Sequence, residues 1–386
     1  MGTMDKLFRL MSEKKATDLF LSCGAPITIK INGIAVPVNP QVLDLAAIRG
    51  LLAEVLNETQ LAELEDTKEL QTRVVVPEIG VYRLSCFYQR GTPALVARYI
   101  PTDIPKFDTL GLPASLKDVI MEKRGLVLMV GATGSGKSTT LTSMLDHRNM
   151  NVTGHILTLE DPLEFLFKNK KSIVNQREVG SDTKAFQIGL KNALRQAPDV
   201  IFIGEIRDKE TMGMAIAYAQ SGHLCLATLH ANNSYHAMSR IISFYPLENR
   251  PALLADLGVT LKCIISQRLC KKPDGSRVAA VEVLMNSRYI GELIEKGELN
   301  EIKDAMENSM VPGSQTFEQA LFTLYRDGII TLDEALANAD SANNLQQVIN
   351  NAASPTAPKK ATTDEEVTRS SPPGTSFSEF TLKLDN

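Results

Sequence analysis

The clearest chemical signal in the sequence is a glycine-rich segment that matches the phosphate-binding pattern G-x-x-x-x-G-K-[ST]. Glycines let backbone N–H groups curl around phosphate oxygens, because no Cβ stands in the way. A lysine at the seventh position suits the β- and γ-phosphates, and the following hydroxyl suits Mg²⁺. The pattern predicts a bound nucleoside triphosphate at these residues: Gly131, Ala132, Thr133, Gly134, Ser135, Gly136, Lys137, Ser138 and Thr139.

The flanks of this segment support the same interpretation. Residues 126–130 are an uninterrupted apolar run, which is typical of a strand buried on both faces. Residues 138–145 have the pattern of a helix. A strand, a glycine-rich turn and a helix in this order place phosphate at a helix N-terminus. A chance loop between strand and helix is the alternative, and the match at every fixed position counts against it.

An acidic segment, LEDPLEF at 159–165, follows the next predicted strand at 156–159. Carboxylates at the carboxyl end of such a strand would face the phosphate site, where one of them can accept a proton from an attacking water. In isolation, an acidic loop with an ordinary turn proline would be the more common explanation.

A second acidic segment, DVIFIGEIRD at 199–208, ends a predicted buried strand at 200–203. Four apolar residues followed by an acid form the second nucleotide-site pattern, although Gly204-Glu205 replaces the usual terminal aspartate. Glu205 is long enough to reach the Mg²⁺ shell. The alternative is a buried strand with a solvated end.

Two histidines, His223 and His230, bracket a predicted apolar strand at 224–229. A zinc site would need more ligands close by, and Cys225 alone does not supply them. Neutral histidines that hydrogen-bond near the γ-phosphate fit the pattern better. A lone histidine would default to the core or the surface, and it is the pair, placed after both acidic segments, that favours a nucleotide site.

Composition excludes several other classes of protein. The net charge of −4 gives no basic field for nucleic acid, so we expect no nucleic-acid partner. No apolar run reaches 18 residues, so we expect no transmembrane segment, and the first residues lack an apolar signal core. The five scattered cysteines favour buried, reduced thiols in a cytosolic protein.

The segments between these motifs predict an α/β protein with several parts. Residues 1–100 read as a small α/β domain, and prolines and glycines at 101–113 indicate a linker. Strands alternate with helices over 114–277, which predicts a doubly wound, mostly parallel sheet. Residues 278–350 look largely helical, whereas 351–386 are rich in Pro, Ser, Thr and charge and are predicted to be disordered. Residues 377–384 are apolar again. They form either a short docking motif or a terminus without a binding function.

In their order and residue identities, the four motifs resemble those of the secretion ATPase superfamily, specifically its type IV pilus retraction ATPases. The resemblance covers about residues 1–350. The resemblance implies a PAS-like N-terminal domain, a RecA-like P-loop ATPase core and a C-terminal helical region, assembled as a homo-hexamer. It implies ATP and Mg²⁺ as the bound species.

Residue by residue, Glu164 resembles the family's catalytic carboxylate, and Glu205 its acid near Mg²⁺, with Ser138 as the other metal ligand. His223 and His230 resemble its histidine pair. The family also completes its site with arginines of the N-terminal domain, and the matching segment at 81–101 assigns charge stabilisation to Arg83 and Arg98.

The family divides into PilT-like and PilU-like branches. PilT-like members carry an AIRxLIRE-type motif, but residues 289–296 read YIGELIEK, so Gly291 and Glu295 replace both arginines. Segments 86–90, 175–180 and 315–321 resemble the PilU-like branch instead. The resemblance implies a motor for pilus retraction and twitching motility. Its expected partners are a PilT-like retraction ATPase and a PilC-like inner-membrane platform protein, and its expected place is the cytoplasmic side of the pilus machine.

Three alternatives stay open beside this function. The first is a regulatory ring subunit that binds ATP and supports a PilT-like motor, which the intact acids disfavour. The second is a secretion or pilus-extension ATPase, although such relatives usually have a longer N-terminal region and a four-cysteine metal element. The third is a nucleic-acid translocase on the same core, which the acidic net charge disfavours.

Overall fold

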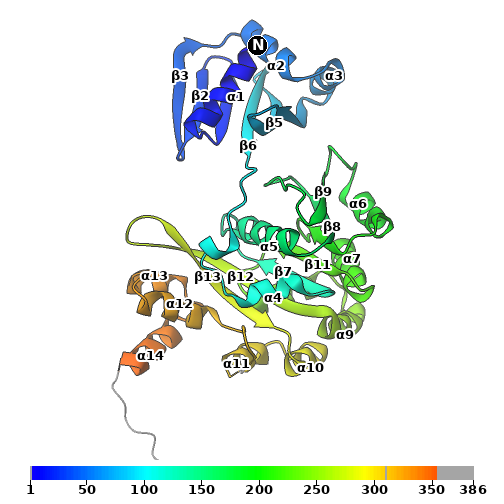
Figure 1. Cartoon of the computed structure of the whole chain (residues 1–386), viewed down its shortest axis with the longest axis vertical. Coiled ribbons are helices and arrows are strands. Elements are labelled where there is room, and N and C mark those ends of the chain that lie inside the picture. The colour runs from blue at the N-terminus through cyan, green and yellow to red at the C-terminus, as the bar shows by residue number, and fades with distance from the viewer. Residues whose placement is uncertain (1, 309–310, 354–386) are drawn as a thin grey trace, which may run out of the picture.

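The computed structural model describes residues 2–308 and 311–353, which form two β-sheets, one after the other along the chain (Figure 1). The predicted disordered tail and its apolar end at 377–384 lie outside the described residues, except that 351–353 belong to the last helix.

The first sheet is antiparallel and has six strands within the described residues, in the order β3-β2-β1-β6-β5-β4. Three helices accompany it. The bounds are α1 (Thr3–Lys14), β1 (Asp18–Ser22), β2 (Pro26–Ile31), β3 (Ile34–Val42), α2 (Leu45–Val55), α3 (Glu58–Thr67), β4 (Glu69–Val76), β5 (Gly80–Gln89) and β6 (Thr92–Ile100).

Two local features of this sheet follow directly from side-chain chemistry. Asn32 and Gly33 have φ values of 51° and 84°, which is the left-handed pair that a two-residue hairpin between β2 and β3 requires. Helices α2 and α3 are separate elements, because Asn57 caps α3. Its side chain accepts from the Gln60 N–H at 2.9 Å, and the Gln60 side chain accepts from the Asn57 N–H at 3.0 Å.

The chain passes to the second sheet through residues 101–106, which have no regular secondary structure (Figure 1). A short 3₁₀ turn at Phe107–Thr109 follows. The carbonyl oxygen of Pro101 accepts a hydrogen bond from the Leu166 N–H at 3.0 Å. The beginning of the connecting segment therefore touches the second sheet's own loops.

The second sheet has seven strands in the described part of the chain, in the order β13-β12-β7-β11-β10-β8-β9. All neighbours are parallel except β13, which pairs with β12 in the antiparallel sense. The bounds are β7 (Gly125–Val130), β8 (Gly154–Glu160), β9 (Ser172–Glu178), β10 (Val200–Ile203), β11 (Leu224–Leu229), β12 (Leu261–Lys271) and β13 (Arg277–Met285). The predicted α/β class and parallel sheet are confirmed.

One expectation about this sheet is wrong. Residues 278–285 were expected within a helical region, but they form strand β13. Val281, Val283 and Leu284 are all fully or almost fully buried, because β13 pairs along nearly the whole length of β12. The helices begin only after this strand, at Arg288.

Helices cover both faces of the second sheet. On one face Leu141 and Met144 of α5 join the side chains of α4 in one core, and on the other face α6 to α11 form a second core. Helices α12 to α14 pack beside β12 and β13 (Figure 1). The bounds are α4 (Ser115–Met121), α5 (Lys137–Asn151), α6 (Phe186–Ala193), α7 (Lys209–Gln220), α8 (Ser234–Ser243), α9 (Arg250–Thr260), α10 (Arg288–Lys296), α11 (Glu301–Glu307), α12 (Phe317–Arg326), α13 (Leu332–Asn338) and α14 (Ala342–Ala353).

Candidate nucleotide site

The glycine-rich loop joins β7 to α5, and α5 begins at Lys137. Gly134 and Gly136 have φ values of 79° and 88°, a conformation that favours glycine. A Cβ on Gly136 would also lie 2.7 Å from the Gln267 Nε2 atom. The loop therefore needs both glycines to wrap around the start of the helix, where backbone N–H groups are free to receive phosphate.

Lys137 is folded back onto its own loop. Its Nζ atom donates to the carbonyl oxygens of Gly131 at 2.8 Å and Ala132 at 2.9 Å. Burial lowers the pKa of Lys137, and the charges of Glu205 and Glu164 act against that shift. The lysine is thus held by neutral carbonyls but lies within the electrostatic reach of both acidic segments.

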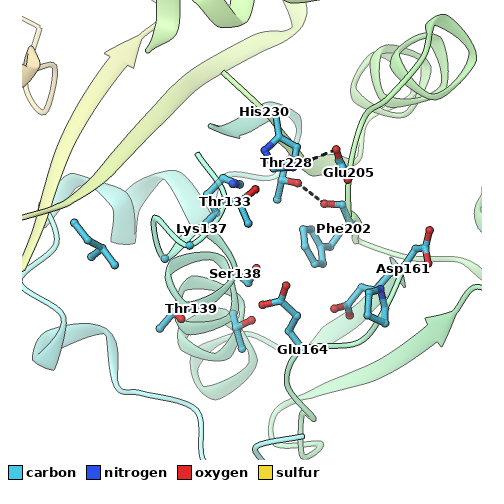
Figure 2. Close-up of a pocket in the computed structure, with 17 residues that line it drawn as sticks. Thr133, Lys137, Ser138, Thr139, Asp161, Glu164, Phe202, Glu205, Thr228 and His230 are labelled. Atoms are coloured by element: carbon cyan, nitrogen blue, oxygen red, sulfur yellow. Dashed lines mark hydrogen bonds and ion pairs between the residues drawn. The ribbon is translucent and has the colours of Figure 1, made fainter. Parts of the chain in front are cut away.

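All four motifs meet at one pocket of about 520 Å³ at the carboxyl ends of the parallel strands (Figure 2). This convergence is what parallel strands produce, because their carboxyl ends share one edge of the sheet. The lining residues are Thr133, Gly134, Gly136, Lys137, Ser138, Thr139, Thr142, Glu160, Asp161, Pro162, Glu164, Phe202, Gly204, Glu205, Thr228, His230 and Leu269.

Two glutamates of the first acidic segment line this pocket in different environments. Figure 2 shows the Glu164 carboxylate directed toward Ser138 at the start of α5. Glu160 is buried, and it accepts hydrogen bonds from Thr158 Oγ1 at 2.6 Å and Gln176 Nε2 at 3.3 Å. Burial raises the pKa of Glu160 to about 7. Glu160 is thus held by its own hydrogen bonds, whereas Glu164 is directed toward the start of α5.

Glu205 follows Gly204 at the end of β10 and pairs with two side chains. Its Oε2 atom accepts from Arg207 Nε at 2.8 Å, and its Oε1 atom lies 3.4 Å from His230 Nε2 (Figure 2). A Cβ on Gly204 would lie 3.1 Å from the Leu159 carbonyl oxygen, so glycine allows the two strand ends to approach closely. This close approach explains the glycine that precedes Glu205.

The oxygen atoms around the pocket suit Mg²⁺ that arrives with phosphate. Ser138 and Glu205 both line the pocket and offer the hard oxygen donors that Mg²⁺ prefers. No cluster of three or more His, Cys, Asp and Glu side chains that could hold a metal by itself occurs in 2–308 and 311–353. The donor set therefore fits a metal held by one or two side chains together with phosphate oxygens, not a closed protein cage.

The two predicted histidines are not neighbours. His230 follows β11 and lines the pocket, whereas His223 precedes β11 and hydrogen-bonds with Ser221 Oγ at 3.0 Å. A six-residue strand separates them, which is about 20 Å of extended chain. The expectation that both histidines lie near the γ-phosphate is therefore wrong for His223 within one chain.

The two predicted arginines lie on the first sheet and do not line the pocket. Arg83 on β5 pairs in register with Arg98 on β6, and Arg98 Nε donates to Asp18 at 2.7 Å. Burial lowers the pKa of Arg83, as does the charge of Arg98, while Glu178 and Glu164 oppose this shift. Arg83 thus lies within electrostatic reach of the catalytic candidate Glu164, and Arg98 is engaged by its own sheet.

Sequence reasoning missed Gln267, which ties the loop to the sheet. This buried side chain of β12 donates to the Ser135 carbonyl at 2.8 Å and accepts from Thr140 Oγ1 at 2.7 Å. It also missed Phe202 and Thr228, which line the pocket from β10 and β11. The available signal was the polar pair Ser266-Gln267 directly after the apolar run Cys263-Ile264-Ile265.

No helix among the residues that the structure describes combines the length and apolar character needed to cross a membrane.

The family described as Type II/IV secretion system protein matches residues 94–362. The chain is 48% identical over 346 residues to the type IV pilus ATPase PilU of Pseudomonas aeruginosa, covering 89% of this chain and 91% of that protein.

PilT of the same organism, a type IV pilus retraction ATPase, is 36% identical over 340 residues, which are 88% of this chain and 99% of PilT. A crystal structure of the pilus retraction motor PilT with bound ADP superimposes with a TM-score of 0.84 at 38% identity, covering 90% of this chain and 100% of the other. These matches confirm the expected α/β class, with an antiparallel N-terminal sheet, the parallel-sheet core of a PilT-like ATPase and C-terminal helices. The chain therefore belongs to the type II/IV secretion system protein family, in its PilT/PilU group of type IV pilus ATPases.

Proposed function

We propose that the chain is an ATP-hydrolysing motor that drives or assists type IV pilus retraction and twitching motility. The observation that carries this proposal is the convergence of the phosphate-binding loop, Glu164 and Glu205 on one pocket. Binding alone would require only the loop, whereas hydrolysis also requires a base for water and neutralisation of phosphate charge. The pocket contains candidates for both.

The phosphates of ATP would lie along the loop N–H groups from Gly131 to Thr139. Lys137 would exchange the Gly131 and Ala132 carbonyls for phosphate oxygens, a small movement because the side chain already starts at the helix N-terminus. Ser138 and Glu205 would hold Mg²⁺, which offsets negative charge on the phosphates when it is bound.

Glu164 would accept the proton of the attacking water. Its carboxylate faces the start of α5, and its own segment is anchored by buried neighbours, so its position is defined before ATP arrives. His230 would hold Glu205 in place through the 3.4 Å contact and would lie beside the γ-phosphate.

Arg83 and Arg98 would complete the site from a mobile N-terminal domain. We assign this domain to residues 1–100, the linker to 101–113, the ATPase core to 114–277 and the helical region to the helices after β13. Arg83 already lies within electrostatic reach of Glu164, whereas Arg98 must leave Asp18 to arrive. Rotation about the linker would therefore turn loss of the γ-phosphate into domain motion.

The motor would work as a homo-hexameric ring at the cytoplasmic side of the inner membrane. It would act with a PilT-like retraction ATPase and pass its motion to a PilC-like platform protein. Similarity to PilU and PilT along nearly nine-tenths of the chain supports this assembly.

A regulatory subunit that supports a PilT-like motor is the second candidate. The specific observation in its favour is that Gly291 and Glu295 occupy the positions of both arginines in the PilT-like motif. Such a subunit would bind ATP without contributing work of its own.

One experiment separates the two functions. The gene is deleted in cells with and without the PilT-like partner, restored as wild type or as Glu164→Gln, which should bind ATP without hydrolysing it, and single-pilus retraction force is measured. A motor predicts loss of force on deletion and recovery with the wild type alone. Recovery with Glu164→Gln would favour the regulatory subunit, and unchanged force after deletion would contradict both.

A further inference from the structure

A row of basic side chains crosses the first sheet. Arg73 on β4 pairs in register with Arg83 on β5, Arg83 with Arg98 on β6, and Arg98 with Asp18 on β1. Residues directly opposite each other on neighbouring strands share one face of the sheet. Arg73 is therefore the third arginine on the face that carries the two predicted charge-stabilising residues, and β4 is the edge strand of that sheet.

Arg73 reaches the second sheet and binds two acids there. Its Nη2 atom lies 2.9 Å and 3.0 Å from the two carboxylate oxygens of Asp182, and its Nη1 atom lies 3.6 Å from Glu178 Oε2. The Arg73 side chain is 25% exposed, and the Glu178 side chain is 7% exposed. Because a buried carboxylate is costly unless it is paired, Arg73 supplies the direct ion-pair partner that Glu178 needs.

Glu178 in turn holds the segment that carries Glu164. The other oxygen of Glu178, Oε1, accepts from the Leu163 N–H at 3.3 Å. Two residues earlier on β9, Gln176 accepts from the Phe167 N–H at 2.8 Å and donates to the Phe165 carbonyl at 2.8 Å. Residues 161–167 have no helix or strand of their own, so these β9 side chains define the path of the segment.

We infer that Arg73 is a positioning residue for hydrolysis: by pairing with Glu178, it makes the placement of the Glu164 segment depend on whether the N-terminal sheet is docked. This inference rests on the proposed role of Glu164 as the base. When the sheet is docked, Glu178 is paired and its second oxygen holds Leu163, the neighbour of Glu164. When the sheet moves away, Glu178 loses its direct ion-pair partner and the hold on Leu163 weakens.

This arrangement differs in kind from the proposed role of Arg83 and Arg98. Those arginines would act on the phosphates themselves, whereas Arg73 bonds to Glu178 and Asp182 and is absent from the pocket lining in the described residues. Loss of Arg73 should therefore slow the chemical step and leave ATP binding intact.

The test compares Arg73→Met with Arg49→Met in the full-length protein. Arg49 is a matched control on the same domain, since its only ion pair is a 4.0 Å surface contact with Glu65 in the part of the chain that the structure describes. We expect kcat of Arg73→Met to fall about ten-fold, with KM for ATP changed less than about two-fold. We also expect faster amide hydrogen exchange in residues 161–167. Arg49→Met should match the wild type in both measurements.

A double-mutant cycle tests the coupling itself. Glu178→Gln keeps an oxygen for the Leu163 N–H but removes the charge that Arg73 pairs with, so it should repeat the Arg73→Met effect. The double variant should be no slower than either single variant, because both changes break the same contact. Arg73→Lys, which keeps the charge and loses the two-oxygen contact with Asp182, should fall between Arg73→Met and the wild type.

The inference is overturned if Arg73→Met keeps wild-type kcat and wild-type protection of 161–167, or if the two effects multiply in the double variant. If Arg73→Met does not fold, the same criteria apply to Arg73→Lys and Glu178→Gln. Glu164→Gln is assayed alongside. Full turnover by Glu164→Gln would contradict the assignment of Glu164 as the base. The hydrogen-exchange data would still report whether Arg73 controls the segment 161–167.

Discussion

Gln267 donates through Nε2 to the carbonyl oxygen of Ser135 at 2.8 Å, so strand β12 holds the phosphate-binding loop from a position far along the chain. The same side chain accepts from Thr140 Oγ1 at 2.7 Å. One buried amide therefore joins the loop, the first turn of α5 and the sheet.

Replacement of this amide should loosen the loop. Gln267→Met keeps the side-chain size but leaves the Ser135 carbonyl and the Thr140 hydroxyl without their partner, which should cost about 2–4 kcal/mol of the free energy of unfolding. ATP affinity should fall as well. Urea unfolding and equilibrium ATP binding check both effects, with Gln347→Met on the exposed side of α14 as the control. A Gln267→Met protein as stable as this control would contradict the assignment.

Glu160 should make stability depend on pH. Burial raises its pKa from an ordinary 4.5 to about 7. Between these values the folded chain binds more protons than the unfolded chain, so the free energy of unfolding falls as the pH rises through this window and levels off above it. The contribution is about 3 kcal/mol.

Glu160→Gln tests this dependence, since the variant cannot lose a proton. Urea unfolding at pH 5 and pH 8, without nucleotide, should show a smaller pH difference for Glu160→Gln than for the wild type. Burial also raises the pKa of Glu282, so part of the slope should remain. An unchanged pH difference in Glu160→Gln would exclude Glu160 as its source.

Gly291 is required by a close helix crossing. A Cβ there would lie 2.9 Å from the Gly258 carbonyl oxygen, where α10 crosses α9. Gly291→Ala should destabilise the protein by about 1–3 kcal/mol, because the overlap with backbone outweighs the gain of about 1 kcal/mol in helix propensity. Gly291→Arg should be at least as harmful. The denaturation midpoint measures both.

Position 295, where the PilT-like motif has its second arginine, provides the control for this helix crossing. Glu295 is exposed on the same helix, so Glu295→Arg should change stability by less than about 0.5 kcal/mol. If Gly291→Arg were as stable as Glu295→Arg, the crossing would not explain the glycine. The PilT-like motif therefore cannot be restored at position 291 without moving two helices apart.

Arg268 joins the C-terminal helices to the segment that follows His230. Its guanidinium lies 4.0 Å above the Phe317 ring, pairs with Asp340, and donates to the carbonyl oxygens of Asn338 and of Asn232, the latter at 3.2 Å. Arg268→Met should lower the free energy of unfolding by about 2 kcal/mol and speed amide exchange in α13 and α14. Arg288→Met, at a 94% exposed side chain, is the control. Unchanged exchange would show that the helices are held elsewhere.

The sequence predicts the centre of this structure well because simple physical rules apply there. Continuous apolar runs identify β7, β8, β10 and β11, and parallel strands bring their carboxyl ends to one edge. The convergence of Lys137, Glu164, Glu205 and His230 follows from that rule. Strands β9, β12 and β13 were not predicted: β9 is largely polar, β12 mixes three basic residues with its apolar ones, and β13 runs on into a segment whose later residues are helical.

Contacts that depend on register or on distant packing could not be predicted. Arg73 and Asp182 are 109 residues apart, and only the strand register places Arg73 in the row with Arg83. Spacing alone paired His223 with His230, but the strand between them carries the two side chains to opposite ends of the sheet. Such relationships require the three-dimensional course of the chain.

The most direct test of the whole account is the steady-state ATPase rate of purified Glu164→Gln beside wild type, Lys137→Ala and Glu298→Gln. Glu298 is exposed and absent from the pocket lining within the described residues, so its variant controls for loss of a carboxylate. We expect Glu164→Gln to fold, to bind ATP with unchanged affinity and to lose at least about 100-fold in kcat. Lys137→Ala should lose ATP affinity, and Glu298→Gln should match the wild type. Near wild-type turnover by Glu164→Gln would contradict its role as the base.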